Sequence, residues 1–319
     1  MNKQTLDFEK PLVELEQKIE ELKKQSEDRN IDLGGEIRGM QDKLESMRGQ
    51  IYGNLSAWQR VQISRHIARP FFLDYVRMAF TDFVELKGDR LFGDDASMPG
   101  GLASIDGVRC VVIGQQKGRD MKENLHRNFG SPHPEGYRKA LRLMRLAEKF
   151  GLPVVALIDT PGAYPGVGAE ERHIAEAIAV NIRDMMTLRT PVVSIVIGEG
   201  GSGGALGIGV ADRVLILENA YYSVISPEGC AAILWKHRSH APEAAEALKL
   251  TAAHLKELGL VDGIVPEPQG GAHHDHASAA EMLKKAIVKN LDELAGQNTA
   301  KMLAARYEKF RAMGVFSGE

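Results

Sequence analysis

The sequence predicts an α/β fold built on a largely parallel sheet, and three features support this prediction. Two short runs, residues 154–158 and 192–197, are mostly apolar and rich in β-branched residues, which is typical of strands buried on both faces. A glycine-rich turn follows each run directly, and a segment that resembles the start of a helix follows each turn. Repeated strand–turn–helix units favour a parallel sheet covered by helices.

Composition is that of an ordinary globular protein and excludes several classes of function. Of the 319 residues, 44% are hydrophobic and 26% charged, and the net charge of −3 gives no reason to expect nucleic acid or an anionic membrane as a partner. Only Cys110 and Cys230 are present, which excludes a four-cysteine zinc site within the chain and fits a reducing compartment. Residues 1–12 lack a signal-peptide core, and no apolar stretch approaches the ~18 residues of a membrane span. We therefore expect a cytoplasmic protein.

Residues 1–60 are predicted to form an N-terminal helical hairpin. Apolar residues recur at helical spacing in two series, which are separated by a polar link at residues 25–35. The two series are Leu12, Leu15, Ile19 and Leu22, and then Ile37, Met40, Leu44, Met47 and Ile51. Because each series is short for a free coiled coil, the hairpin is expected to pack on the main body or on another subunit. The alternative is a solvated helical pair that only stabilises the fold.

The main α/β body is predicted to span residues 61–296 and to be followed by a helical C-terminal tail at 297–319. Helices are expected at residues 58–86, 135–150, 169–188, 241–258 and 277–295. Beyond the two apolar runs, strands are expected at residues 101–106, 108–115, 213–218 and 222–225. Asp106-Gly107 is a strong hairpin-turn dipeptide, and Ser226-Pro227-Glu228 is a good helix start with a capping hydroxyl, a proline and an acid.

The two glycine turns are the candidate catalytic elements. Gly162 and Ala163 in the first turn, and Gly203 and Gly204 in the second, would expose backbone N–H groups at the start of a helix. A preorganised donor aimed at developing negative charge contributes roughly 2.7–4 kcal/mol. The two turns therefore favour an enzyme that stabilises anionic oxygens with main-chain amides.

Two other interpretations of the second turn are open at this stage. Residues 198–203 match the dinucleotide fingerprint G-x-G-x-x-G, with Glu218 near the expected ribose position, although the crossover helix would be short. Gly200, Gly201 and Ser202 also begin a G-x-S-x-G pattern, which would make Ser202 the nucleophile of a serine hydrolase. Its partners would be Asp262 and one of His237, His240, His254 or His273. The phosphate-loop pattern for ATP is absent.

A basic stretch at residues 117–127, after the strand expected at residues 108–115, is the second candidate site. Lys117, Arg119, Lys122 and Arg127 lie in a glycine-punctuated loop and are expected to bind a phosphorylated or carboxylated ligand, or an acidic partner surface. The following basic residues, Arg138, Lys139, Arg142 and Arg145, are interpreted as the solvated face of an amphipathic helix.

Tyrosines and histidines give weaker signals. Tyr164 and Tyr137 would line a pocket or pack in the core. His273, His274 and His276 are assigned to a surface loop rather than to a metal site, and we expect no metal within this chain.

Several long blocks resemble one protein family. They are Arg127-Asn-Phe-Gly130, residues 134–143, residues 159–172, Gly198-Glu-Gly-Gly-Ser-Gly-Gly-Ala205 and residues 223–231. Together these blocks closely resemble the α subunits of the carboxyltransferase component of bacterial acetyl-CoA carboxylase, and the resemblance runs essentially from end to end. It implies a ClpP/crotonase-like ββα superhelix and formation of malonyl-CoA, the first committed step of fatty acid synthesis.

The resemblance also implies partners and cofactors. The family works with a β subunit that holds the zinc, commonly as an α2β2 assembly, and biotin carboxylase and the biotin carboxyl carrier protein supply carboxybiotin. No Met-Lys-Met biotin-attachment sequence occurs here, so biotin would arrive on another chain. From the matching motifs, Gly203 and Gly204 are the first choice as hydrogen-bond donors to the biotin ureido oxygen. Gly162 and Ala163 are the second choice. A second pocket, expected mainly on the β subunit, would hold the thioester enolate.

Overall fold

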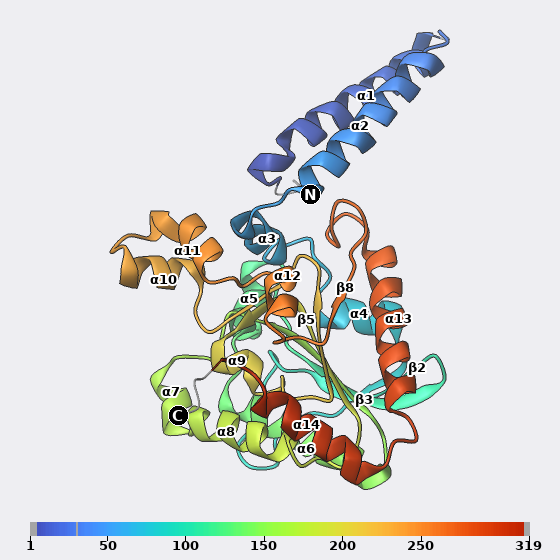
Figure 1. Ribbon diagram of the computed structural model, residues 1–319. Helices are drawn as coiled ribbons and strands as arrows, with labels where there is room; N and C mark the ends of the chain where they lie inside the picture. The colour runs from blue at the N-terminus through green and yellow to red at the C-terminus, as the bar shows by residue number, and fades with distance from the viewer. Residues whose placement is uncertain (1–4, 30, 316–319) are drawn as a thin grey trace.

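The computed structural model describes residues 5–29 and 31–315, and within them eight strands form one mixed sheet. The strand order is β1-β2-β3-β4-β5-β6-β8, and β7 pairs with β5 (Figure 1). The strands are β1 Thr81–Glu85, β2 Gly100–Ile105, β3 Val108–Gly114, β4 Val154–Thr160, β5 Val192–Gly201, β6 Arg213–Leu217, β7 Tyr221–Ser223 and β8 Gly263–Val265. The predicted α/β class and largely parallel sheet are therefore confirmed.

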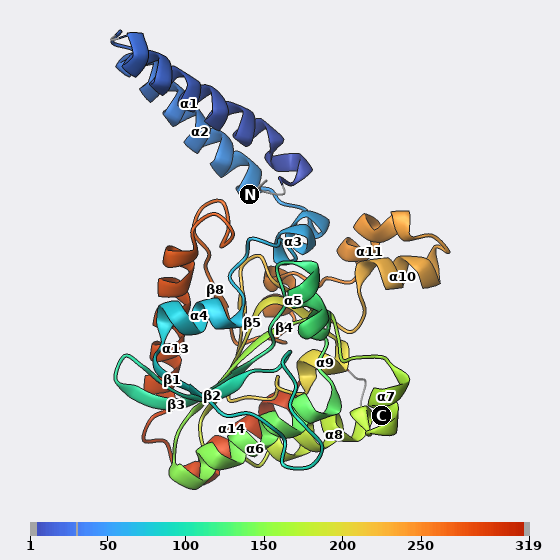
Figure 2. The ribbon, with the colours of Figure 1, turned by 180° about the vertical axis from the view of Figure 1, so that it is seen from behind.

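Helices cover the sheet on two sides. In both ribbon views, α6, α8 and α14 lie together along one side of the sheet, and α4 and α13 lie along another (Figures 1 and 2). The long helices of the body are α6 Pro134–Phe150, α8 Ile174–Met185, α13 His276–Leu294 and α14 Thr299–Arg311. The shorter ones are α3 Ala57–Ser64, α4 Phe72–Ala79, α5 Met121–His126, α7 Val167–Glu171, α9 Ser202–Leu206, α10 Pro227–Leu234, α11 Ala241–Ala247 and α12 Ala252–Glu257.

Strand pairing follows the residue patterns closely. The β2 and β3 strands form an antiparallel hairpin, and its turn residues Asp106 and Gly107 both have positive φ, at 50° and 82°, as a tight hairpin turn requires. From β3 onward the pairing is parallel, with Val111 opposite Val154 and Val154 opposite Val192. Every residue of β4 and β5 is buried, which explains their continuous apolar runs.

Two expected helices are interrupted. The helix expected at 58–86 is wrong in its second half, because the chain leaves α3, forms α4 and then enters the edge strand β1. Pro70 disfavours helical geometry at the residue before it and so separates α3 from α4. The helix expected at 169–188 is divided into α7 and α8 by His173, whose φ of 63° is left-handed.

The predicted start of α10 is confirmed, because the Ser226 hydroxyl accepts a hydrogen bond from the Gly229 amide at 3.1 Å. At the other end of the body, α14 is anchored by a buried ion pair. Arg306 on α14 donates to the Asp212 carboxylate at 2.6 Å and to the carbonyls of Met185 and Leu188. These bonds connect α14 to the end of α8 and to the segment that precedes β6.

The N-terminal hairpin consists of α1 Lys10–Arg29 and α2 Gly34–Gly53, which pack against each other and project away from the sheet (Figures 1 and 2). Its base contacts the body, where Glu9 bonds to Tyr52 and, at 2.8 Å, to His273. The surface-loop assignment is therefore wrong for His273, which is only 6% exposed. The reason is that the base of the hairpin covers this loop.

A buried ion pair joins the N-terminal part of the body to the strand ends. Arg69 donates two hydrogen bonds to the Glu267 carboxylate at 2.7 and 2.8 Å and also contacts the Ile197 carbonyl. The amides of Asn219 and Ala272 donate to the same carboxylate. Burial opposes the charge of Glu267, but Arg69 and these donors outweigh it and lower the pKa of Glu267 to about 2.

The Glu267→Gln variant is expected to lower the free energy of unfolding at pH 7 by about 3–5 kcal/mol, because it leaves Arg69 charged and buried. The folded-state pKa of about 2 lies below the ordinary 4.5, so the contribution of Glu267 is complete above pH 4.5 and is lost as the pH falls toward 2. In urea unfolding, the free energy of unfolding should therefore decrease less from pH 5.5 to pH 3 for the variant than for the wild type. An equal decrease in both proteins would contradict this role of Glu267. The exposed Glu281→Gln variant serves as the control.

Candidate active site at the two glycine turns

The two glycine turns lie in direct backbone contact at the ends of the adjacent parallel strands β4 and β5. A Cβ atom placed on Gly204 would lie 2.4 Å from the Ala163 nitrogen and 2.5 Å from the Gly162 carbonyl carbon. One placed on Gly201 would lie 2.2 Å from the Pro161 oxygen. Glycine is required at these positions because two main chains approach more closely than any side chain allows.

Unpaired amides gather where the turns meet. The first amides of α9, those of Ser202, Gly203 and Gly204, have no acceptor within the helix. Within the described part of the chain, no acceptor contacts the Ala163 amide either. The Gly162 amide differs, because it donates to the Thr160 hydroxyl at 3.1 Å. Of the four predicted donors, Ala163 therefore has no acceptor among the described residues, Gly203 and Gly204 lie in the first turn of α9, and Gly162 is occupied.

Two buried side chains donate hydrogen bonds to the main chain of the second glycine turn. Gln115, directly after β3, donates to the Gly204 carbonyl at 2.8 Å and accepts a bond from the Asp159 amide at 3.0 Å. The Tyr137 hydroxyl on α6 donates to the same Gly204 carbonyl at 3.0 Å. Tyr137 packs in the core, which is one of the two possibilities that the sequence left open, and its hydroxyl also fixes the orientation of the turn. Gln115 was missed by the sequence analysis.

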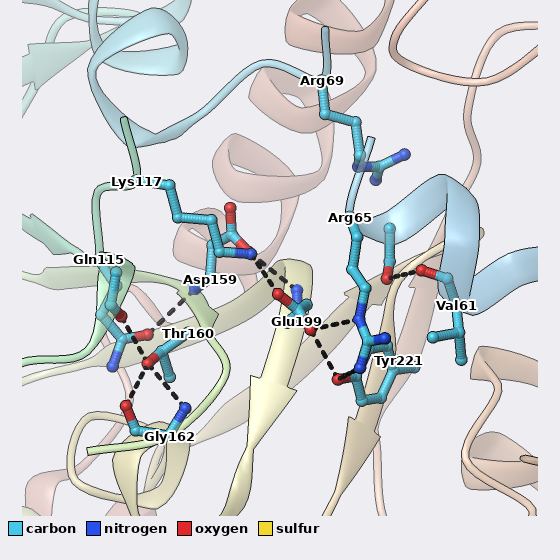
Figure 3. A network of polar contacts seen from close by, with 12 residues as sticks. Val61, Arg65, Arg69, Gln115, Lys117, Asp159, Thr160, Gly162, Glu199 and Tyr221 are labelled. Carbon is cyan, nitrogen blue, oxygen red and sulfur yellow. Dashed lines mark hydrogen bonds and ion pairs between the residues drawn. The ribbon is translucent and has the colours of Figure 1, made fainter. Parts of the chain in front are cut away.

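Lys117 forms the centre of a buried charge network beneath the turns. Its ammonium lies 2.6 Å from the Asp159 carboxylate and 2.7 Å from the Glu199 carboxylate, at the ends of β4 and β5 (Figure 3). Glu199 also pairs with Arg65 at 2.7 Å and accepts a bond from the Tyr221 hydroxyl (Figure 3). The Lys117 ammonium is therefore satisfied inside the fold, where it ties the two strand ends together.

The pKa shifts within this network follow from burial and charge. Burial works against the negative charge of Glu199, but Lys117 and Arg65 outweigh it and lower its pKa to about 2. For Asp159, burial dominates over the effect of Lys117, and its pKa is raised. Burial likewise opposes the charge of Lys117, but the two carboxylates prevail and raise its pKa. Lys117 is therefore a fixed cation and not a general base.

The other predicted basic residues do not gather in one cluster. Arg119 pairs with Asp74 at 2.7 Å and lies over the Phe71 ring, and Arg127 donates to the Ala96 carbonyl. Lys122 is exposed on α5. On α6, the predicted solvated face is wrong for Lys139, which is 1% exposed and pairs with Asp94 at 2.5 Å.

An apolar cavity of about 300 Å³ opens beside α9. Ser202 and Gly203 line it together with Leu206, Tyr222, Val224 and Phe310. Ser202 is exposed and has a left-handed φ of 51°, so the chain turns sharply from β5 into α9 at this residue. Tyr164 lies in the first turn, half-buried, with its ring 4.2 Å from the His133 ring. Gly203 has no close neighbour, since a Cβ there would meet only Ile178 at 3.8 Å.

The structure contradicts both alternative interpretations of the second turn. Gly198, Gly200 and Gly201 continue strand β5 instead of forming a phosphate-binding turn, and α9 is only five residues long. The proposed triad does not assemble, because Asp262 bonds to the Val214 amide and Lys309. The candidate histidines have other partners, with His237 bonded to Ser239, His240 to Glu243, His254 to Thr251 and His273 to Glu9.

One group of side chains in the described residues has metal-ligand spacing, namely Glu9, His273 and His274, whose ligand atoms lie within 4.8 Å of one another. Burial lowers the pKa of His273 to about 4, and the Nδ1 atom of His273 has no hydrogen-bond partner. This group lies at the base of the hairpin and not at the glycine turns. None of the helices between residues 5 and 315 is long and apolar enough to cross a membrane.

Comparison with known proteins decides the family. The family described as acetyl co-enzyme A carboxylase carboxyltransferase-like matches residues 5–314. The chain belongs to this family. Curated relatives include the acetyl-coenzyme A carboxylase carboxyl transferase subunits alpha of Geobacter metallireducens, 57% identical over 98% of both chains, and of Thermus thermophilus, 56% identical over 98% of this chain and 99% of that one. The resemblance inferred from the motifs is confirmed.

Solved structures support the crotonase-like fold at much lower identity. Transcarboxylase 12S superposes with a TM-score of 0.57 at 18% identity and covers 70% of this chain and 41% of that chain. A Pseudomonas malonate decarboxylase hetero-tetramer superposes with a TM-score of 0.55 at 18% identity, covering 67% of this chain and 86% of that one. At this level of identity the likeness concerns the fold alone, and it confirms the predicted fold class.

Proposed function

We propose that this chain is the α subunit of a two-subunit carboxyltransferase that transfers a carboxyl group from carboxybiotin to acetyl-CoA and so forms malonyl-CoA. The names of the relatives support the reaction, and one feature of this chain supports the mechanism. That feature is the backbone contact of the two glycine turns, which brings Gly204 against Ala163, while Ser202 and Gly203 line the apolar cavity beside α9. Among the described residues, no carboxylate, histidine, lysine, arginine or cysteine lines that cavity.

The residues present fit a biotin ring, because the ring offers a ureido oxygen to amide donors and an apolar body to the cavity. Carboxybiotin, carried on another chain, supplies the carboxyl group and then a nitrogen that accepts the methyl proton of acetyl-CoA. Gly203 and Gly204 donate hydrogen bonds to the ureido oxygen, on which negative charge grows as the carboxyl group leaves. Ala163 is the next available donor. Since proton transfer is supplied by the substrate, Lys117 and its carboxylates have a positioning role only.

The remaining components are proposed to lie on partner chains. A zinc-containing β subunit would provide the second oxyanion pocket, for the thioester enolate, in an α2β2 assembly. Biotin carboxylase and the biotin carboxyl carrier protein would regenerate and deliver carboxybiotin, and exposed Lys122 is available to contact either the carrier or acetyl-CoA. The two buried free thiols, Cys110 and Cys230, fit work in the reducing cytoplasm.

Co-expression with the β subunit tests this function. The purified complex is expected to decarboxylate malonyl-CoA in the presence of free biotin, which is the reverse half of the proposed reaction. The β subunit alone, carrying its zinc, is expected to be inactive. A stable complex of both chains without biotin-dependent malonyl-CoA decarboxylation would contradict the proposal.

The Tyr137→Phe variant tests the support of the turn. It removes one hydrogen bond to the Gly204 carbonyl and leaves the Gln115 bond in place. Because a single neutral hydrogen bond contributes about 0.5–1.5 kcal/mol, kcat of the complex should fall roughly 2- to 12-fold, with KM for malonyl-CoA unchanged.

Tyr75→Phe is the matched control. Tyr75 is equally buried, but its hydroxyl has no hydrogen-bond partner among the described residues, so its removal should leave kcat unchanged. If both variants kept wild-type kcat, or if Tyr137→Phe changed only KM, the positioning role of Tyr137 would be excluded.

A further inference from the structure

A second cavity, of about 730 Å³, lies between α6, α8 and the loop at residues 89–92, apart from the glycine turns. Figure 2 shows α6 and α8 side by side at this edge of the body. Five arginines line the cavity, and only two carboxylates, Asp89 and Glu176, face them. The arginines are Arg90, Arg138, Arg142, Arg145 and Arg172. Arginines therefore outnumber carboxylates in the cavity lining, although the chain as a whole is slightly negative.

Three of these arginines are neutralised within the chain. Arg138 pairs with Asp89 at 2.8 Å, Arg172 with Glu135 at 3.0 Å, and Arg145 with Asp184. These pairs use the Asp89, Asp184 and Glu135 carboxylates and hold the walls of the cavity in place. They leave Glu176 and the remaining two arginines without an ion pair among the described residues.

Arg90 and Arg142 have no carboxylate partner in the part of the chain that the structure describes. Arg90 donates to the Lys87 carbonyl at 3.0 Å, and Arg142 donates to the carbonyls of Gly88, Leu86 and Lys87. Burial and then the positive charge of Arg90 lower the pKa of Arg142. The Asp94 and Asp89 carboxylates act on Arg142 in the opposite direction but more weakly, so a bound anion would relieve the remaining repulsion between the two guanidinium groups.

The inner end of the cavity offers an unsatisfied acceptor. Asn181 on α8 lines the cavity but is only 1% exposed, and its side-chain nitrogen donates to the Tyr137 and Gly207 carbonyls at 2.9 Å. Its Oδ1 atom is buried and has no partner among the described residues. Because a buried polar atom without a partner is unfavourable, a small movement of the Asn181 side chain that lets a ligand donor reach this oxygen would be favourable.

Apart from His173, the rest of the lining is apolar. Leu141 and Val180 form the walls, and the Leu91 and Phe92 side chains are 78% and 65% exposed at the rim. The Arg172 guanidinium already lies over the Phe92 ring, 4.5 Å from its centroid. A cavity of this volume, apolar with a few convergent polar groups, suits an organic molecule of nucleotide size.

We propose that this cavity binds a phosphorylated organic molecule. Its phosphate groups accept hydrogen bonds from Arg90 and Arg142, whose planar forks match phosphate oxygens. A hydroxyl or amine at its other end donates to Asn181 Oδ1, and its flat or apolar body packs against Leu91 and Phe92. The site shares no residue with the cavity at the glycine turns, so the proposal stands independently of the carboxyltransferase mechanism.

Equilibrium dialysis of the full-length chain with ADP, inorganic pyrophosphate and adenosine tests this proposal. ADP is expected to bind one molecule per chain, with at least tenfold higher affinity than either pyrophosphate or adenosine. Arg90→Met and Arg142→Met should each weaken ADP binding at least tenfold. Arg90 is exposed and bonds only to a backbone carbonyl, so its variant should fold even if the Arg142 variant does not.

Two control variants show whether ADP binding depends on this cavity. Arg109→Met removes an exposed arginine on β3, outside the cavity, and should not change ADP binding. Gly204→Val should also bind ADP normally, because it alters the glycine turns and leaves the arginines in place. No ADP binding, equal losses in Arg90→Met and Arg109→Met, or pyrophosphate binding as tight as that of ADP would each overturn the proposed organic phosphate site.

Discussion

Gly204→Val is expected to lower kcat of the carboxyltransferase complex by about 10²–10³-fold while both subunits remain assembled. A Cβ atom on Gly204 would lie 2.4 Å from the Ala163 nitrogen, so the two turns must separate to accommodate any side chain. Separation redirects the Gly203 and Gly204 amides, and losing one preorganised donor of this kind has an effect of that size. The measurement is biotin-dependent malonyl-CoA decarboxylation by the purified complex, with assembly checked by size-exclusion chromatography.

Gly203→Ala is the matched comparison one residue away. Its Cβ would meet only the Ile178 side chain at 3.8 Å, an ordinary contact, and its backbone amide is kept. We expect this variant to keep kcat within a few-fold of the wild type. If Gly204→Val kept full kcat, or if Gly203→Ala lost as much activity, close contact of the turns could not be the basis of catalysis.

Lys117→Met is expected to lower the free energy of unfolding by about 3–5 kcal/mol, because it leaves the Asp159 and Glu199 carboxylates buried without their shared cation. Since these carboxylates lie at the ends of β4 and β5, we also expect kcat to fall in the assembled complex. Urea unfolding monitored by circular dichroism gives the stability.

Lys122→Met is the control for the same loop. Lys122 is exposed on α5, and its replacement should change the free energy of unfolding by no more than about 0.5 kcal/mol. If Lys117→Met were as stable as the wild type but raised KM for substrate, Lys117 would be a binding residue, as the sequence first suggested, and the buried network would not describe the protein.

Local patterns predicted much of the fold because the responsible interactions are local. Apolar β-branched runs identified β4 and β5, Asp106-Gly107 identified the β2–β3 turn, and Ser226 identified the cap of α10. Each of these signals depends on residues adjacent in sequence. The same is true of the glycine turns, whose position directly after buried strands marked them as candidate sites.

Non-local contacts account for what the sequence did not reveal. Residues 81–85 have no strong strand signal of their own and become β1 only by pairing with β2. His173 interrupts a helix through a left-handed φ that no residue pattern announced. At the site, Lys117 looked like a free cation because Asp159 and Glu199 lie far from it in sequence. Gln115 carried no signal and Tyr137 only a weak one, since both support the turn through bonds to the Gly204 carbonyl, which lies far from them in sequence.

A structure of the complete complex with biotin bound tests most directly whether main-chain amides carry the chemistry. The ureido oxygen of biotin is expected within about 2.7–3.1 Å of the Gly203 or Gly204 nitrogen, with the ring in the cavity beside α9. Biotin bound elsewhere, or oriented with its ureido oxygen held by side chains alone, would contradict that assignment.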